Sequence, residues 1–126
     1  MFELSKQFRF EAAHTLHRAT DAEPSRRIHG HSYRAEVTVR GERDPVSGMV
    51  IDCGFFERAI EVARLGLDHH FLDDVPDLGH GTIENLSAWI WRVLAPVCSG
   101  LARVTVYRDS TGDSCAYFGP AGTRHD

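Results

Sequence analysis

The chain has 126 residues and a formal net charge of −4 at pH 7, with 42% hydrophobic and 25% charged residues. This length suits one domain with its own core, and we expect residues 1–126 to form a single domain. The acidic balance argues against a nucleic-acid binder, and the lack of a long apolar run argues against a membrane span. Three scattered cysteines without a Cys-x-x-Cys pair favour a reducing cytoplasm over a disulfide scaffold.

Two long strands are predicted in the first third of the chain. Apolar residues alternate with polar ones over residues 2–14 and again over residues 29–40. This period of two is typical of strands with one buried face in an antiparallel sheet. The polar stretch between them, residues 18–27, is predicted to be a loop long enough to have a function.

Two helices follow, each with a recognisable start. Asp52 can cap a helix whose apolar stripe ends near Gly66, and Thr82 can cap a second helix that ends near Pro96. Three further strands are predicted, at residues 49–51, 102–106 and 115–118. Strands, then helices, then strands indicate an α+β fold with an antiparallel sheet, of order ββααββ.

Three histidines form the sharpest local pattern of the chain. His29 and His31 point to the same face of one strand, about 6.6 Å apart along it, and His14 ends the preceding strand with matching parity. Three histidines that leave a fourth position open are typical of a catalytic zinc site. The alternative is an apolar face that ends in histidines satisfied by the protein itself. The matching parity of His14 leads us to favour the metal site.

A second group, Asp68-His69-His70, follows the first predicted helix. A carboxylate beside a histidine can fix its tautomer and raise its basicity, as a general base requires. Alternatively, the histidines only complement the dipole at a helix C-terminus. Spacing alone favours this second interpretation.

Five short segments, in this order, resemble the 6-pyruvoyl-tetrahydropterin synthase / 6-carboxy-tetrahydropterin synthase family. The resemblance extends over nearly the whole chain, and the bacterial 6-carboxy branch, which serves queuosine-type deazapurine biosynthesis, is the most similar. The segments are Phe10–His14, His29–Tyr33, Gly48–Asp52, Leu67–Leu72 and Thr82–Trp91.

The resemblance implies a tunnelling fold, in which a four-stranded antiparallel sheet carries two helices on one face. It implies a homo-oligomer, usually a hexamer built as a dimer of trimers, with active sites between subunits. It also implies a zinc-dependent lyase that acts on a pterin-like small molecule such as 7,8-dihydroneopterin triphosphate.

The same resemblance assigns roles to individual residues. It implies that Asp68 and His69 transfer protons and that Thr82 and Glu84 help to shape the pterin pocket. The zinc ligands that it implies are His14, His29 and His31.

Two positions depart from the family pattern. Ser25 stands where the family has a cysteine as general base, and a hydroxyl is far harder to deprotonate than a thiol. Arg108 stands where the family has a glutamate that grips the pterin ring, with Asp109 one residue further. We therefore predict a zinc-dependent lyase with an altered site. The alternatives are a relative recruited to another substrate in secondary metabolism and a non-catalytic protein that binds zinc or pterin.

Overall fold

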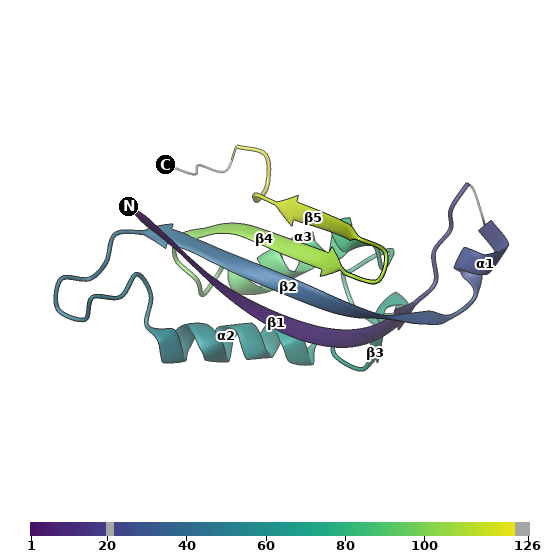
Figure 1. The fold of residues 1–126 in the computed structure, drawn as a ribbon, viewed down its shortest axis with the longest axis horizontal. Coiled ribbons are helices and arrows are strands. Elements are labelled where there is room, and N and C mark those ends of the chain that lie inside the picture. The colour runs from purple at the N-terminus through teal and green to yellow at the C-terminus, as the bar shows by residue number, and fades with distance from the viewer. Residues whose placement is uncertain (20–21, 123–126) are drawn as a thin grey trace.

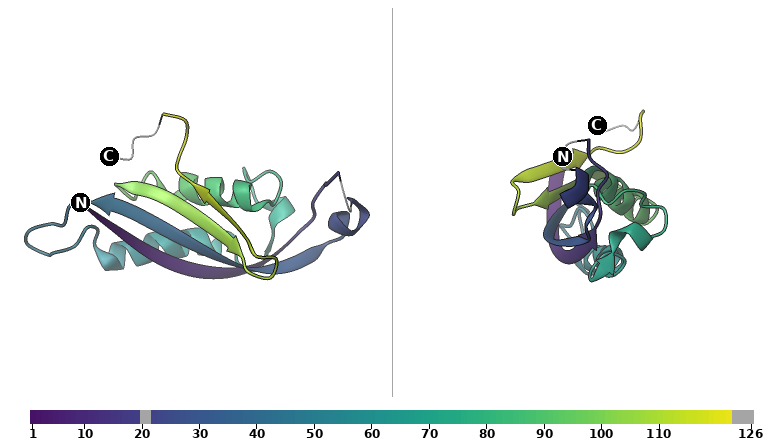
Figure 2. Two further views of the ribbon diagram at one scale, coloured as in Figure 1. Left: turned by 45° about the horizontal axis from the view of Figure 1, so that its top comes forward. Right: turned by 90° about the vertical axis from the view of Figure 1, so that its right-hand side faces the viewer.

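A twisted sheet with two helices on one face makes up the body of the protein. The computed structural model describes residues 1–19 and 22–122. Figure 1 and the end-on view of Figure 2 show the sheet as one layer and the helices α2 and α3 as the other. Among the described residues, no helix combines the length and the apolar character needed to cross a bilayer. The predicted α+β architecture, with two helices on one face, is confirmed.

The strands β1 and β2 form a long antiparallel ribbon at the centre of the molecule. Strand β1 (Phe2–His14) pairs with β2 (His29–Gly41) along its whole length, so that His14 lies opposite His29. Strand β4 (Leu101–Arg108) pairs with the other edge of β2, and β5 (Asp113–Tyr117) pairs with β4. These four antiparallel strands are the predicted ones.

The sheet differs from the prediction by a fifth strand. Strand β3 (His70–Phe71) runs parallel to β1 and pairs with Ala12 and Ala13 at its outer edge, so the order is β3-β1-β2-β4-β5 and the sheet is mixed. Two residues are too few to produce an alternating pattern in the sequence. The short 3₁₀ helix η1 (Leu72–Asp74) follows directly.

The prediction of a strand at residues 49–51 is wrong. Both edges of β2 are occupied by β1 and β4, and Val50 and Ile51 pack against the core from an irregular segment instead. Within the predicted loop at 18–27 the chain forms the short helix α1 (Ala22–Arg26). The loop predicted at 18–27 therefore contains one short helix, and the residues predicted as a strand at 49–51 contribute to the core without forming a strand.

Both long helices begin at the predicted caps. The Asp52 carboxylate accepts a hydrogen bond from the backbone N–H of Phe55 at the start of α2 (Cys53–Leu65). The Thr82 hydroxyl accepts one from Asn85 N–H at the start of α3 (Ile83–Leu94). A side-chain oxygen at this position satisfies an N–H that the helix itself leaves unpaired.

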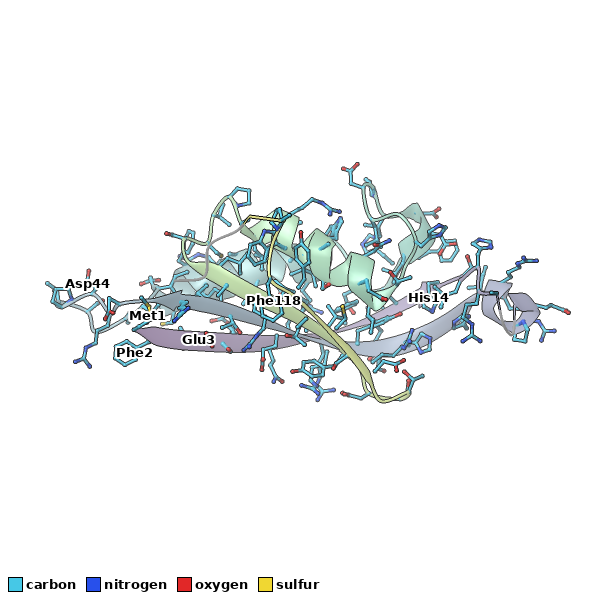
Figure 3. All side chains as sticks on the ribbon, turned by 90° about the horizontal axis from the view of Figure 1, so that it is seen from above. Met1, Phe2, Glu3, His14, Asp44 and Phe118 are labelled. Atoms are coloured by element: carbon cyan, nitrogen blue, oxygen red, sulfur yellow. The ribbon has the colours of Figure 1, made fainter. Side chains whose placement is uncertain are left out.

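The core lies between these helices and the face of the sheet on which apolar side chains alternate. On β1 the side chains of Phe8, Phe10 and Ala12 are buried there, while Phe2 and Leu4 remain 45% and 40% exposed. Figure 3 shows Met1, Phe2 and Asp44 at one end of the molecule and His14 toward the other. Along β1, burial therefore increases from Phe2 toward His14.

Candidate metal centre

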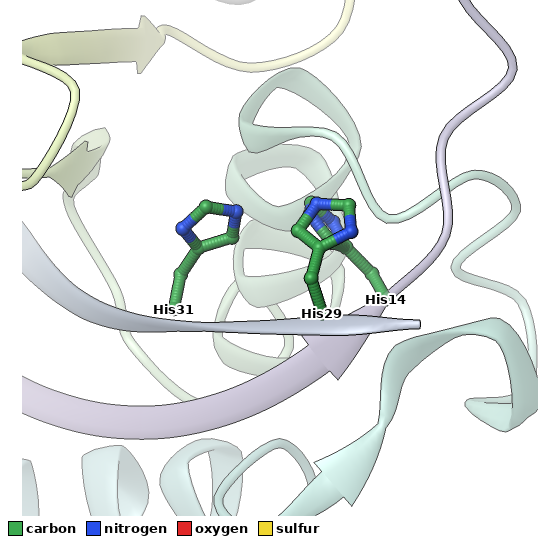
Figure 4. Close-up of side chains that lie close together, drawn as sticks. All are labelled: His14, His29 and His31. Atoms are coloured by element: carbon green, nitrogen blue, oxygen red, sulfur yellow. The ribbon is translucent and has the colours of Figure 1, made fainter. Parts of the chain in front are cut away.

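The structure brings His14, His29 and His31 together on the helix-covered face of the sheet. The antiparallel register places His14 opposite His29 and Ala12 opposite His31. One ring nitrogen from each histidine lies within 4.8 Å of the other two. Figure 4 shows the three rings gathered above the strand. His14 is fully buried, and the other two are partly exposed. The three side chains can therefore converge on one ion that remains open to a ligand from outside.

Backbone carbonyls orient two of these rings. His14 Nδ1 lies 2.7 Å from the carbonyl oxygen of Gly81, and His29 Nδ1 lies 2.7 Å from that of Arg27. A carbonyl only accepts, so each Nδ1 carries the proton and each Nε2 keeps its lone pair. Metal-binding histidines almost always have such an outer partner on the other nitrogen.

The Nε2 atom of His14 is the clearest sign of a missing ligand. Among the described residues, it is the one buried side-chain nitrogen or oxygen that has no hydrogen-bond partner. Buried polar atoms are seldom left unpaired in folded proteins, because the lost hydration is costly. A metal ion held by this lone pair satisfies the atom, which speaks against the alternative of self-satisfied histidines.

The electrostatics of the cluster favour the neutral imidazole at His14 and His31. Burial, with smaller contributions from the neighbouring His14 and Arg108, lowers the pKa of His31 to about 4. Burial also lowers the pKa of His14, against the opposing effect of its bond to Gly81. Neutral imidazole is the form that binds a metal. Three such nitrogens with a fourth position open fit a catalytic zinc ion.

Asp68 and His69 form a second chemical group, at the outer edge of β1. Asp68 accepts hydrogen bonds from Glu11 N–H (2.9 Å), Arg64 (2.9 Å) and His69 Nδ1 (2.9 Å). The Glu11 N–H, ahead of His69, holds the pKa of Asp68 at about 2. An ionised carboxylate therefore fixes Nδ1–H on His69 and leaves its Nε2 available for proton transfer.

His69 is held in an unusual conformation that turns its ring outward. Its φ is +58°, its backbone N–H donates to Glu11 O at 2.6 Å, and its side chain is 79% exposed. His69 and His31 both line an open cavity of about 440 Å³ on this side of the ribbon. Among the described residues, no hydrogen bond joins the Asp68–His69 pair to the three histidines.

The structure separates Arg108 from Asp109. Arg108 lies on the face of the histidines and lines a cavity with His29 and His31. Asp109 instead binds Arg34 through both carboxylate oxygens, at 3.1 and 3.2 Å. The pairing of β4 with β5 runs without a shift as far as Arg108, so no bulge turns Asp109 toward the site.

The structure says less about the other predicted site residues, which are Thr82, Glu84 and Ser25. Thr82 uses its hydroxyl to cap α3, directly after the Gly81 carbonyl that orients His14, and Glu84 is exposed on the first turn of that helix. Ser25 falls within α1, but its side chain lies outside the described residues.

Gly81 is a functional residue that sequence reasoning missed. A Cβ at this position would lie 3.1 Å from the Cβ atoms of both His14 and Leu72. A side chain at this position would be tightly crowded, so glycine favours the close approach in which its carbonyl reaches the His14 ring. The glycine just before the Thr82 cap was visible in the sequence, but nothing there linked it to His14.

Comparisons with known proteins agree with this geometry. A protein-family model described as 6-pyruvoyl tetrahydropterin synthase matches residues 3–120. A 6-pyruvoyl tetrahydrobiopterin synthase of Poecilia reticulata is 42% identical over 100 residues, 68% of each chain. A 6-carboxy-5,6,7,8-tetrahydropterin synthase of Synechocystis is 34% identical over 126 residues, 95% of each chain.

The fold is shared with solved structures as well. A 6-pyruvoyl tetrahydropterin synthase of Caenorhabditis elegans superposes with a TM-score of 0.80 at 27% identity, covering 94% of this chain and 96% of that one. This likeness confirms the predicted tunnelling fold, with β3 as an addition to the four expected strands.

Proposed function

Since the chain belongs to the 6-pyruvoyl tetrahydropterin synthase family, we propose that it is a zinc-dependent lyase acting on 7,8-dihydroneopterin triphosphate or a related compound. Family membership supports the lyase activity. The observation that carries the zinc site is the buried, unpartnered Nε2 of His14 beside His29 and His31. We take residues 1–126 as a single catalytic domain.

The three histidines would hold the ion through ring nitrogens, and their carbonyl partners at Gly81 and Arg27 would keep them in place. When bound, zinc supplies Lewis-acid polarisation of substrate oxygens. His69 would accept and return protons at Nε2 while the Asp68 carboxylate holds its Nδ1–H. Ser25 would contribute little as a base, since a hydroxyl needs an adjacent base to act.

The position of His69 supports an oligomer with shared sites. Its ring turns outward at the outer edge of β1, where β3 pairs with only Ala12 and Ala13 and leaves the edge from 2 to 11 without a partner strand among the described residues. Open edges of this length invite pairing with another chain. We propose a homo-oligomer, a hexamer made as a dimer of trimers, in which His69 of one copy serves the metal centre of its neighbour.

The similarity to a named relative also suggests the pathway in which the protein acts. The similarity to the Synechocystis 6-carboxy enzyme supports a role in queuosine-type deazapurine biosynthesis. The three cysteines are all free thiols, which is in keeping with a cytoplasmic protein.

The test is to purify the protein, measure its zinc content and incubate it with 7,8-dihydroneopterin triphosphate. We expect one zinc per chain, release of triphosphate and a 6-substituted tetrahydropterin identified by mass spectrometry, with the 6-carboxy product assigning the branch. Light scattering should show a species well above the 14.1 kDa of the monomer. A zinc-free monomer that leaves this compound intact would contradict the proposal.

A further inference from the structure

A second, smaller cavity adjoins the histidines on the side away from the Asp68–His69 pair. It measures about 230 Å³, and its walls include His29, His31, Arg18, Arg108 and Thr111. Among the described residues that line it there is no carboxylate. The polar residues of its wall are therefore two arginines, two histidines and one threonine.

Arg108 is rigidly placed in this wall. Its Nε donates to Thr111 Oγ1 at 2.9 Å, and its Nη2 donates to Asp113 Oδ2 at 2.6 Å. Thr111 in turn donates to the same carboxylate oxygen, at 2.8 Å. The side chain of Arg108 is only 16% exposed, whereas Asp113 is 49% exposed. The anchoring carboxylate thus lies toward solvent and the guanidinium lies toward the cavity.

This anchoring leaves Arg108 able to bind a ligand. A guanidinium has five N–H donors in a planar fork. The bonds to Thr111 and Asp113 use two of them and a hydrogen bond with Tyr33 uses another, so donors remain for a ligand. Burial is the main cause of the lowered pKa values of His14 and His31, and the positive charge of nearby Arg108 adds to it. The fork is therefore held beside the metal centre before any ligand arrives.

The chemistry of Arg108 restricts what it can bind. A guanidinium has no acceptor, so it cannot pair with the amino group and ring N–H of a pterin. Its planar donors match the oxygens of a carboxylate or a phosphoryl group, with which arginine forms paired, charge-assisted hydrogen bonds. A cavity of about 230 Å³ has room for a group of that size.

We propose that Arg108 determines substrate specificity by binding an oxyanion of the substrate in this cavity, next to the atoms held at the metal centre. This inference rests on the proposed function for the identity of the site. The oxyanion is either a carboxylate or a phosphoryl group.

The experiment measures binding rather than turnover. Inorganic phosphate and malonate are titrated into the full-length protein, with and without zinc, and dissociation constants are obtained from NMR chemical shifts. Neopterin, which has an uncharged side chain, is titrated in parallel. In Arg108→Gln we expect the dissociation constant of at least one oxyanion to rise about 10- to 100-fold, the range for a hydrogen bond to a charged group. Whichever oxyanion responds more strongly identifies the source.

Arg34 provides a matched control. It is also paired with an aspartate of the β4–β5 region, but it binds Asp109 on the other face of the sheet and packs on Tyr107. Arg34→Gln should leave oxyanion binding unchanged. Arg108→Lys keeps the charge but loses the fork, so it should weaken binding less than Arg108→Gln. If Arg108→Gln does not fold, as judged by its melting curve, Arg108→Lys decides the question.

The inference would be overturned if the dissociation constant of each oxyanion were the same in Arg108→Gln as in wild type. It would also be overturned if Arg108→Gln lost neopterin binding and oxyanion binding to the same extent. These results do not depend on the proposed function. Oxyanion binding that requires Arg108, in a protein that leaves dihydroneopterin triphosphate intact, would support the inference and reject that substrate. Turnover of dihydroneopterin triphosphate, in a protein whose oxyanion binding is the same with and without Arg108, would support that substrate and reject the inference.

Discussion

The metal centre and the Asp68–His69 pair each contain an imidazole whose Nδ1 is bound to an oxygen, but one imidazole is buried and the other is exposed. In the metal centre, His14 has no exposed surface and its Nδ1 is bound to a backbone carbonyl. In the Asp68–His69 pair, the imidazole is 79% exposed and its Nδ1 is bound to a carboxylate. In both groups the oxygen on Nδ1 fixes the tautomer and directs Nε2. In the first group Nε2 points into a cluster, and in the second it points out of the molecule.

The difference shows which chemistry is complete within one chain. The metal centre has all three ligands, and burial lowers the pKa of His31 to about 4 so that the ring stays neutral. The pair has a charged orienting group, since the pKa of Asp68 is lowered to about 2, but its Nε2 lies on a ring that is 79% exposed. The three histidines are therefore assembled within one chain, whereas the Asp68–His69 pair presents its imidazole to the outside.

Removing a metal ligand should give the largest effect. We expect His31→Ala to lose stoichiometric zinc and all turnover, because two imidazoles cannot replace a three-nitrogen site. The loss of affinity should exceed the 10- to 100-fold that the loss of an outer partner typically costs. Metal analysis of the purified variant provides the measurement. Retention of one zinc per chain would mean that the ion lies elsewhere.

Removing the base of the exposed pair should separate the two groups. We expect His69→Ala to lower kcat about 10²- to 10⁴-fold, the usual range for general acid–base catalysis, without changing the zinc content. His70→Ala is the matched control, because His70 is also exposed and lies next in the chain but has no carboxylate on its ring. A parallel loss of zinc in His69→Ala would show that the two groups are not independent.

The features that could be predicted from the sequence are those that side chains encode locally. The Asp52 and Thr82 caps and the alternation along β1 and β2 were enough to place both helices and the central ribbon. The same alternation brought His14 to the face of His29 and His31, because parity in paired strands determines the face.

The features that escaped prediction depend on the backbone or on distant partners. Strand β3 exists because hydrogen bonds hold two residues against β1, and Val50 and Ile51 pack against the core without pairing with a strand. The carbonyl of Gly81 orients His14 from 67 positions away, and a carbonyl is present in every residue. Whether Arg108 or Asp109 lies on the face of the histidines depends on the register of β4 and β5, which the sequence alone did not show.

A change at Gly81 should weaken the metal centre without removing a ligand. A methyl group there would lie 3.1 Å from the Cβ of His14, so Gly81→Ala should shift the ring or lengthen its hydrogen bond. We expect zinc affinity to fall about 10- to 100-fold. Competition with a chelator measures this. Gly41→Ala is the control, since its new methyl group would meet only Val50, at 3.6 Å, near the other end of the sheet. Equal affinities in both variants would contradict the role assigned to Gly81.

The smallest expected effect concerns the stability that Asp68 contributes. Its pKa is lowered to about 2, first by the N–H of Glu11, from an ordinary value of about 3.9 in the unfolded chain. A carboxyl group with a lowered folded pKa stabilises the protein above its unfolded pKa, and this contribution is lost as pH falls toward the folded value. Asp68→Asn should therefore melt a few degrees below wild type at pH 7, and the gap should narrow between pH 4 and pH 2. Melting curves at several pH values test this. A gap that stays constant down to pH 2 would show that the charge on Asp68 does not stabilise the edge of β1, and that the ionised carboxylate serves only to hold His69 for proton transfer.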